Sequence, residues 1–258
     1  MRERIWMYVA ALLITAALGA AGCSEGDRPS NPLAARTGGG APDISSLSAR
    51  ISIEFDPQNF VSEIDNPYLP WKPGATYTYV STSKDGPETI VVEVLHQKKN
   101  ILGVDATIVH DRVTVNGELL EDTFDWYAQD KDGNVWYLGE DTKEYENGVV
   151  VSTFGSWEAG VGGAQAGIIM LANPEKGDTY SQEDAPEIAE DMARVVSLSE
   201  SVTVPYGTFS PVVKILEWTP LEPGSRGYKY YAQGIGVVLE SSKKSGGERV
   251  ELVSVTGL

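Results

Sequence analysis

The sequence predicts an all-β protein whose antiparallel meander sheets derive from an internally duplicated unit of about 100 residues. From residue 51 onward, nearly every segment alternates in polarity or is rich in β-branched and aromatic residues, and turn signals separate the segments. Short motifs also recur in the same order 103 or 104 residues later. The connections are too short for parallel crossovers, so we expect a curved half-barrel or a sandwich of antiparallel strands.

Residues 1–22 are predicted to be a lipoprotein signal peptide. A short basic start precedes an apolar run, Ile5 to Ala21, that is too short and too rich in alanine and glycine for a comfortable membrane span. The run ends in Ala20-Ala21-Gly22-Cys23, which resembles a bacterial lipobox, although Ala20 stands where leucine is commoner. The resemblance implies cleavage before Cys23 and attachment of diacylglycerol and an acyl chain such as palmitate to that residue. The alternative is an ordinary signal peptide with an incidental cysteine.

Composition limits the partners of the exported chain. Cys23 is the only cysteine, so the mature fold contains no internal disulfide and depends on burial alone for its stability. The full chain carries a net charge of −17, which argues against binding to nucleic acid and against adsorption to an anionic membrane surface. The charge permits a cationic or metal partner, or simply good solubility.

Residues 23–50 are predicted to form a disordered tether. The stretch is rich in Ser, Gly, Pro, Ala and Asp, and it lacks the apolar residues that a packed fold requires. A random coil of roughly 25 residues would reach roughly 25–30 Å from the membrane. The remainder, 51–258, is expected to be a single β domain made of two repeats, at about 66–156 and 173–258.

The first repeat is expected to contain six strands. They are predicted at residues 76–80, 90–95, 104–115, 118–129, 134–145 and 149–154. Asn116-Gly117 between the third and fourth strands is a strong type I′ hairpin signal, and Asn147-Gly148 marks a second turn. Asp130-Lys131-Asp132-Gly133 is typical of a type I turn closed by a glycine with positive φ.

The second half matches the first. Gly74-Ala75-Thr76-Tyr77 corresponds to Gly177-Asp178-Thr179-Tyr180, Tyr127-Ala128-Gln129 corresponds to Tyr231-Ala232-Gln233, and Val135 corresponds to Val238. We therefore expect residues 74–140 to superpose on 177–240. The match also predicts a strand at Met192–Val204, where the pattern alone would allow a helix. Gly155–Ala172 lies between the repeats and, because it is rich in glycine, is predicted to be a linker or a loop over one end of the sheet.

Aromatic residues on the hairpin at 124–141 are candidates for a ligand surface. Its turn places Tyr127 opposite Tyr137 and Trp126 opposite Leu138. Adjacent residues point to opposite faces, so one face could fill the core while the other stacks against a ligand. The candidates on this hairpin are Trp126, Tyr127, Trp136 and Tyr137. Tyr230 and Tyr231, in the matching stretch of the second half, are candidates as well. The alternative is that all of them are ordinary core residues.

Carboxylates gather at the end of the same hairpin that is far from its turn. The predicted register brings together Asp122, Asp125, Glu140 and Asp141. Paired carboxylates could act as the acid and base of a glycoside hydrolase or bind calcium through their oxygens. The alternative is a solvated strand end, in which Glu121 faces Lys143 as a supporting pair.

A second candidate for calcium is the hairpin turn. Asp130, Asp132 and Asn134 are spaced as in the start of a calcium loop, but Gly133 stands at position four, where an EF-hand has its glycine at position six. Turn chemistry explains the aspartates and the glycine without a metal. Calcium is the one cofactor that these oxygens would allow, and no other cofactor is predicted.

The sequence predicts no catalytic residue. It lacks a Gly-x-Ser-x-Gly motif and a His-Glu-x-x-His motif, and its two histidines, His96 and His110, lie in or beside predicted strands without a nearby nucleophile. A zinc site would require both histidines and carboxylates from separate strands.

Several stretches resemble a widespread family of secreted or lipid-anchored bacterial β proteins to which no function has been assigned. The resemblance rests on NPYLPWKPG (66–74), DWYAQDKDGNVWYLGED (125–141), GIIMLANPEKGDTY (167–180), SVTVPYGTF (201–209) and WTPLEPG (218–224). It covers about residues 55–240 and implies no catalytic residues. The predicted architecture is also similar to that of periplasmic lipoprotein carriers, whose curved half-barrel sheets hold acyl chains, but a fold does not fix a function.

These observations lead to a lipid-anchored protein on the extracytoplasmic side of the bacterial cell envelope. We expect a non-catalytic binding module for an apolar ligand or an envelope component, held at the membrane through Cys23. One alternative is a carboxylate-dependent hydrolase of envelope glycans. Another is a calcium-binding adhesion or assembly subunit.

Overall fold

The structure is a computed structural model that describes residues 50–83, 86–242 and 247–258. The predicted signal peptide, Cys23 and nearly all of the predicted tether lie outside the described residues. Within them the chain forms strands and one three-residue 3-10 helix, Pro57–Asn59, with no α-helix. None of the described residues forms a helix long and apolar enough to cross a membrane. The all-β prediction is confirmed.

The strands belong to one antiparallel sheet of fourteen. In chain order they are β1 (Thr76–Ser83), β2 (Gly86–Ile101), β3 (Val104–Val115), β4 (Glu118–Gln129), β5 (Val135–Glu146), β6 (Val149–Ser152), β7 (Trp157–Glu158), β8 (Gly167–Met170), β9 (Thr179–Ser181), β10 (Met192–Val204), β11 (Gly207–Trp218), β12 (Arg226–Ala232), β13 (Gly236–Ser242) and β14 (Arg249–Thr256). The order across the sheet is β6-β5-β4-β3-β2-β1-β14-β13-β12-β11-β10-β9, and β7 and β8 both pair with β5.

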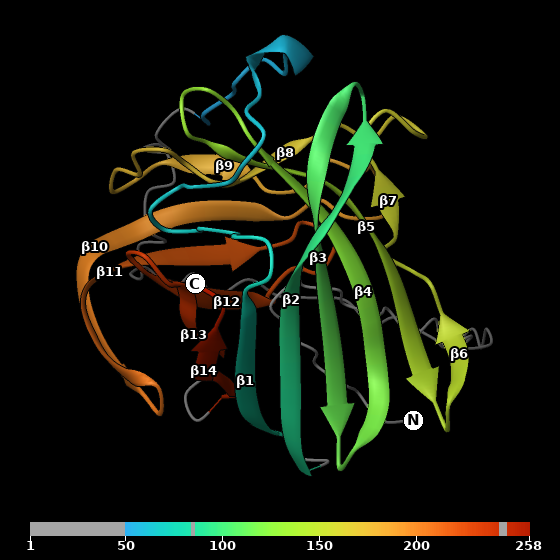
Figure 1. Cartoon of the computed structure of the whole chain (residues 1–258), viewed down its shortest axis with the longest axis vertical. Helices are drawn as coiled ribbons and strands as arrows, with labels where there is room; N and C mark the ends of the chain where they lie inside the picture. Colours follow the sequence, from blue (N-terminus) through green and yellow to red (C-terminus); the bar gives the residue numbers. More distant parts are fainter. Residues whose placement is uncertain (1–49, 84–85, 243–246) are drawn as a thin grey trace, which may run out of the picture.

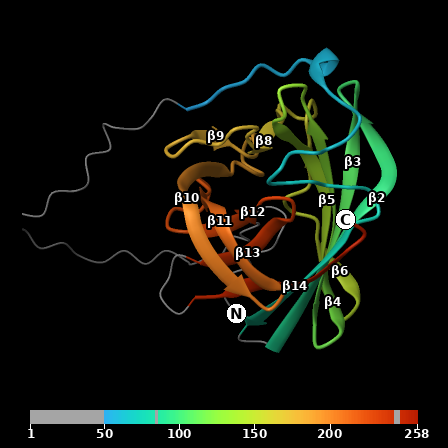
Figure 2. The same ribbon diagram turned by 60° about the vertical axis from the view of Figure 1, so that its left-hand side comes forward.

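The sheet consists of two meanders that meet in its middle. β1 to β6 form the first meander, β9 to β14 form the second, and β1 pairs antiparallel with β14. Figure 1 shows β1 to β6 side by side as one wall, and Figure 2 shows the second meander curling round to face that wall. β6 and β9 end the strand order without pairing to each other, so the sheet stays open. The predicted curved antiparallel meander is confirmed.

The two meanders start with the same turn. The Gly74 amide donates to the Val94 carbonyl over 2.8 Å, and the Gly177 amide donates to the Val195 carbonyl over the same distance. Both glycines have a positive φ, 90° and 105°, which glycine adopts at little cost. This turn and the equal strand order are what an internal duplication requires. The superposition of 74–140 on 177–240 stays a prediction.

The register of the central hairpin is as predicted at Tyr127 and differs by one residue from Asp125 onward. Tyr127 lies opposite Tyr137 as predicted, but the pairing then steps to Asp125 opposite Glu140. The extra residue of this β-bulge lies in β5, where Leu138 and Gly139 together stand against Trp126 of β4.

Beyond the bulge every pairing moves by one residue. Glu121 lies opposite Glu144, and Lys143 lies opposite Asp122, so the predicted pair of Glu121 with Lys143 is wrong. A shift of one residue exchanges the two faces of a strand. The strand whose faces are exchanged is β5, which brings Glu140 to the inward face, whereas Glu121 is buried because it alternates in phase with Asp125 on β4.

The second hairpin repeats this bulge. Lys229 lies opposite Glu240 and Tyr231 lies opposite Val237. Val237 therefore occupies the place that Tyr137 has in the first hairpin. The predicted match of Val135 with Val238 is wrong, because the shorter second turn changes the offset beyond it.

Of the two predictions made for residues 155–204, one is confirmed and one is corrected. The strand predicted at Met192–Val204 is present with those bounds as β10. The segment Gly155–Ala172, predicted as a linker or loop, contains the two short strands β7 and β8. β7 fits beside β5 because Gly139 has no side chain: a Cβ there would lie 2.2 Å from the Trp157 carbonyl oxygen.

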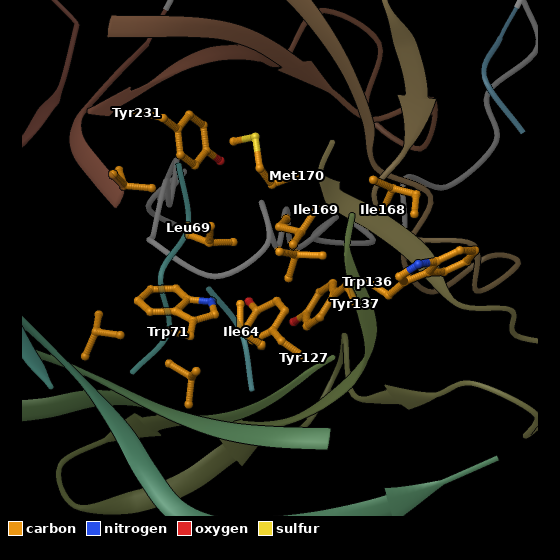
Figure 3. Packing of buried hydrophobic residues seen from close by; sticks show 14 of the residues in the cluster. Ile64, Leu69, Trp71, Tyr127, Trp136, Tyr137, Ile168, Ile169, Met170 and Tyr231 are labelled. Carbon is orange, nitrogen blue, oxygen red and sulfur yellow. The ribbon is translucent and has the colours of Figure 1, made fainter. Parts of the chain in front are cut away.

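The segment 51–75 precedes β1 and crosses the top of the sheet in Figure 1; we call it the strap. The Asn66 side-chain amide donates to the Gly133 carbonyl over 2.8 Å, which ties the strap to the first meander. The Pro67 carbonyl accepts from the Gly234 amide over 2.7 Å, which ties it to the second. Ile64, Leu69 and Trp71 of the strap enter the hydrophobic core between the meanders, as Figure 3 shows.

Candidate functional site

Ionisable side chains line the inner face of the sheet, below the apolar core. We call this set the interior acid cluster: Asp111 (β3), Glu121 and Asp125 (β4), Glu140 (β5), Glu183, Glu217 (β11), Lys229 (β12) and Glu240 (β13). All eight are buried. Alternation along the strands places them there, as in β3, where Val109, Asp111 and Val113 share the inward face. The cluster thus occupies positions that would normally hold apolar side chains.

Tyr137 joins two members of the cluster. Asp125 and Glu140 face each other on neighbouring strands. The Tyr137 hydroxyl lies 2.5 Å from Asp125 Oδ1 and 3.1 Å from Glu140 Oε2. A phenol has one hydrogen to donate, so it cannot donate to both carboxylates at once. Both hydrogen bonds form together only when one of the two carboxyl groups is protonated and donates to Tyr137.

Lys229 is the cation of the cluster. Among the residues whose burial the structure describes, it is the only buried lysine or arginine. Its Nζ lies 3.2 Å from Glu217 Oε2, and Gln182 donates to the other oxygen of Glu217 over 2.9 Å. Burial lowers the pKa of Lys229, but Glu217 and Glu240 outweigh this effect and the pKa is raised. Lys229 is therefore positively charged at neutral pH.

Burial raises the pKa of six carboxyl groups of the cluster, those of Asp111, Glu121, Asp125, Glu140, Glu183 and Glu240. Burial raises the pKa of Glu121 and of Glu240 to about 8. Burial also raises the pKa of Asp125 to about 7, although the hydrogen bond from Tyr137 lowers it. For Asp111 and Glu140 burial and the neighbouring carboxylates both raise the pKa. Much of the cluster is thus protonated at neutral pH, because removing so many anions from water is costly.

Several oxygens of the cluster have no hydrogen-bond partner among the described residues. They are both carboxyl oxygens of Asp111, Oδ2 of Asp125, Oε1 of Glu140 and Oε1 of Glu240. Buried polar atoms in proteins are nearly always hydrogen-bonded, and an unpaired one costs free energy. The interior therefore has acceptor capacity that the described residues do not use.

The carboxylates predicted to gather at the hairpin end are divided between the two faces of the sheet. Asp125 and Glu140 face each other, and they do so in the interior, where the sequence predicted only that they gather at the hairpin end. Asp122 and Asp141 point to the outer face, where Asp122 Oδ1 lies 2.5 Å from His110 Nε2 and Asp141 accepts from Lys143 over 2.8 Å. Since adjacent residues of a strand point to opposite faces, Glu140 and Asp141 cannot share one site.

The predicted aromatic residues mostly fill the core. The rings of Tyr127 and Tyr137 stack with centroids 4.7 Å apart on the inner face, and Tyr231 faces them from the second meander in Figure 3. On the outer face Lys99 covers Trp126 at 3.1 Å from the ring centroid. Five of the six are thus buried in the fold, as the core alternative expects.

The two remaining aromatic rings, those of Trp136 and Tyr230, are also covered by other side chains. Phe55 and Phe60 of the strap pack against Trp136, with ring centroids 5.5 and 5.9 Å away. Tyr230 is half-buried, and Lys214 lies over its ring at 5.1 Å. No open stacking surface is formed by these six residues.

The oxygens of the predicted calcium loop serve the turn. Asp130 accepts from the Asn134 amide over 2.8 Å, from the Asn134 side chain over 2.9 Å and from Trp136 Nε1 over 2.9 Å. The side-chain oxygen of Asn134 accepts from the Ala172 amide, and Asp132 is exposed. In the described part of the chain, no group of three or more His, Cys, Asp or Glu side chains is arranged to hold a metal ion.

Sequence reasoning missed most of the cluster. Asp111, Glu183, Glu217, Lys229 and Glu240 were not among the predicted site residues. One signal could have found Lys229: it lies two residues before Tyr231, so it shares the inward face, and it lies 104 residues after Asp125. Charged residues in alternation normally indicate the solvent side of a strand, and that expectation hid the others.

The chain is similar to two solved bacterial structures. No protein-family model and no curated protein sequence matches the chain. One similar solved structure is an exported protein with a YmcC-like fold from Bacteroides fragilis, with 19% identity, 74% of this chain and 99% of that chain covered, and a TM-score of 0.45. Another is a lipoprotein from Parabacteroides distasonis, with 12% identity, the same coverage and a TM-score of 0.40. At these values neither protein indicates what this chain binds.

Proposed function

We propose that the protein is exported, anchored by lipid to the bacterial cell envelope on its extracytoplasmic side, and acts there as a non-catalytic binding module. The signal-peptide pattern and Cys23 support the anchor. One structural observation supports binding: buried carboxyl oxygens of Asp111, Asp125, Glu140 and Glu240 lack partners in the interior that the two meanders share. A ligand group placed there would satisfy them.

The apolar ligand expected from the sequence would have to compete with the protein's own side chains. Ile64, Leu69 and Trp71 of the strap pack against Tyr127 and Tyr231 in the apolar part of the interior (Figure 3). Such a ligand would enter only when the strap moves. The polar part of the interior is therefore the better supported place for binding.

The alternative of a glycan hydrolase requires carboxylates that a polysaccharide can reach. Asp125 and Glu140 do face each other, with Tyr137 between them, but each is only 1% exposed. An acid and a base of a glycosidase must also leave room for the sugar ring and a water molecule. We therefore propose binding, and not glycan hydrolysis, as the function of the protein.

Replacing Cys23 tests the anchor. We expect Cys23→Ser to appear in the soluble fraction or as an uncleaved precursor, because the lipid attachment site is lost and two or three acyl chains no longer hold the protein. Membrane fractionation with a carbonate wash measures this, and Ser24→Ala is the matched control that should remain membrane-bound. A Cys23→Ser protein that is still processed and still resists the wash would contradict the lipid anchor.

Native mass spectrometry tests the binding role. The protein purified from its own cell envelope should carry an additional mass beyond that of the lipidated polypeptide. Asp111→Asn should lose this mass, because it changes a carboxylate with two unpaired oxygens. Asp122→Asn on the outer face should keep it. Finding only the polypeptide and its own lipid in repeated preparations would overturn the proposed function.

A further inference from the structure

We propose that the interior acid cluster binds its ligand through a protonated amine, held by Asp111, Asp125, Glu140 and Glu240. This inference rests on the proposed binding function and names the chemical class of the ligand. Its starting point is the set of unpaired oxygens at these four residues, all of them at least nine-tenths buried.

The hydrogen-bond requirement of the site matches an ammonium group. Five carboxyl oxygens lack a donor within the described chain, and Asp111 contributes two of them. An ammonium group carries three N–H donors and no acceptor, so it adds only what the site lacks. The nearest cation of the protein, Lys229, is engaged by Glu217 at 3.2 Å. Hydrogen bonds from a cation to carboxylates are also about twice as strong as neutral ones.

The charges of the site also favour an organic cation. The cluster contains seven carboxyl groups and a single lysine, so a bound cation would offset charge that the protein otherwise avoids by keeping carboxyl groups protonated. A metal ion would neutralise them, but it requires three or more ligands converging within its short bond distances, and no described group of side chains meets that condition. An ammonium group accepts longer and less regular contacts, of about 2.7–2.9 Å.

The second meander provides an internal precedent. Asp125 opposite Glu140 and Lys229 opposite Glu240 occupy the same place in the two bulged hairpins. In the second meander, the amine of Lys229 stands at this place and is held by Glu217. In the first meander the same place holds Asp125, and the one amine whose charge acts on it, that of Lys229, is engaged by Glu217. The ligand would supply to the first hairpin the group that Lys229 supplies to the second.

Refolding in the presence of simple cations tests this inference. The wild-type protein is unfolded in urea and diluted at pH 8 into n-butylamine hydrochloride, tetramethylammonium chloride or sodium chloride at equal ionic strength, and its melting temperature is measured. Refolding gives each cation access to a site that is closed in the folded state. Tetramethylammonium has the same charge as butylammonium but no N–H donor. We expect butylamine alone to raise the melting temperature, by at least about 2 °C and with saturation.

Two variants connect the shift to the site. Asp111→Asn should abolish most of the butylamine shift, whereas Asp122→Asn, on the outer face of the neighbouring strand, should retain it. Glu140→Gln provides a second test if Asp111→Asn does not refold. Equal shifts with both organic cations, an unchanged shift in Asp111→Asn and Glu140→Gln, or no saturable shift in the wild type would each overturn the amine assignment.

The same experiments distinguish a wrong amine assignment from a wrong proposed function. A bound mass without an amine, found by native mass spectrometry and lost in Asp111→Asn, would leave the binding role intact and refute the amine. No bound mass and no butylamine shift would refute both, and protons alone would then balance the cluster.

Discussion

Raising the pH from 5 to 9 is expected to destabilise the folded domain strongly. Glu121 and Glu240 have a pKa of 4.5 when exposed and of about 8 in the fold, and the pKa of Asp125 rises from 3.8 to about 7. Between these values the unfolded chain has released its protons while the folded chain retains them. Unfolding therefore releases protons, and stability falls as the pH rises through this window. The stabilisation is fully present below about pH 4 and is lost once the pH exceeds about 8.

The size of the effect follows from how steeply the free energy of unfolding falls with pH. Each of these groups should cost up to about 1.4 kcal/mol of unfolding free energy per pH unit within its window. Urea denaturation at pH 5, 6, 7, 8 and 9 measures the slope. Glu121→Gln, which cannot ionise, should flatten it, whereas Glu118→Gln at the exposed start of the same strand should not. A stability that is constant or increases between pH 5 and 8 would refute the picture of a protonated interior.

Removing the only described buried cation should be the most damaging single substitution. Lys229→Met deletes the partner of Glu217 and leaves the carboxylates of the interior without a counter-charge. Breaking a buried ion pair in this way costs roughly 3–5 kcal/mol. A domain has only about 5–15 kcal/mol in total, so the variant should be largely unfolded at moderate urea concentrations. Urea titration at pH 7 measures the loss.

Two comparisons make the Lys229 prediction specific. Lys214→Met changes a partly exposed lysine that lies 4.2 Å over the ring of Tyr228 on the outer face, and it should cost at most about 1 kcal/mol. Adding Glu217→Gln to Lys229→Met should recover part of the loss, because the unpaired carboxylate is then removed. The idea fails if Lys229→Met melts with the wild type, or if the double variant is no better than the single one.

The sequence made the strands predictable but not their exact register. Turn signals such as Asn116-Gly117 and alternation within each segment are local, so the first meander could be predicted from neighbouring residues, whereas β10 needed the match between the two halves. The bulge opposite Trp126 lies in β5, and its one local mark is Gly139, a glycine with positive φ inside a strand pattern. One extra residue was enough to bring Glu140 to the inward face that Tyr137 occupies and to place Glu144, in place of Lys143, opposite Glu121.

The candidate site depends on tertiary structure and was therefore only partly predictable. Asp125 and Glu140 could be brought together because one hairpin contains both. Asp111 and Lys229 become neighbours only because the second meander folds over the first, and the sequence gives no sign of that closure. An acid that alternates with valines in β3 indicates a half-solvated strand until another layer covers it.

The pairing of β1 with β14 has a kinetic consequence. The strands in the middle of the sheet, Thr76–Ser83 and Arg249–Thr256, come from opposite ends of the described chain. Each meander can form from local hairpins, but the contact between them closes a loop of nearly the whole domain, and such contacts form slowly. Until β14 is available for pairing, β1 has an open edge on the side that β14 will occupy. An open edge can pair with another chain, so the time between the two strands is when this protein is most prone to aggregate.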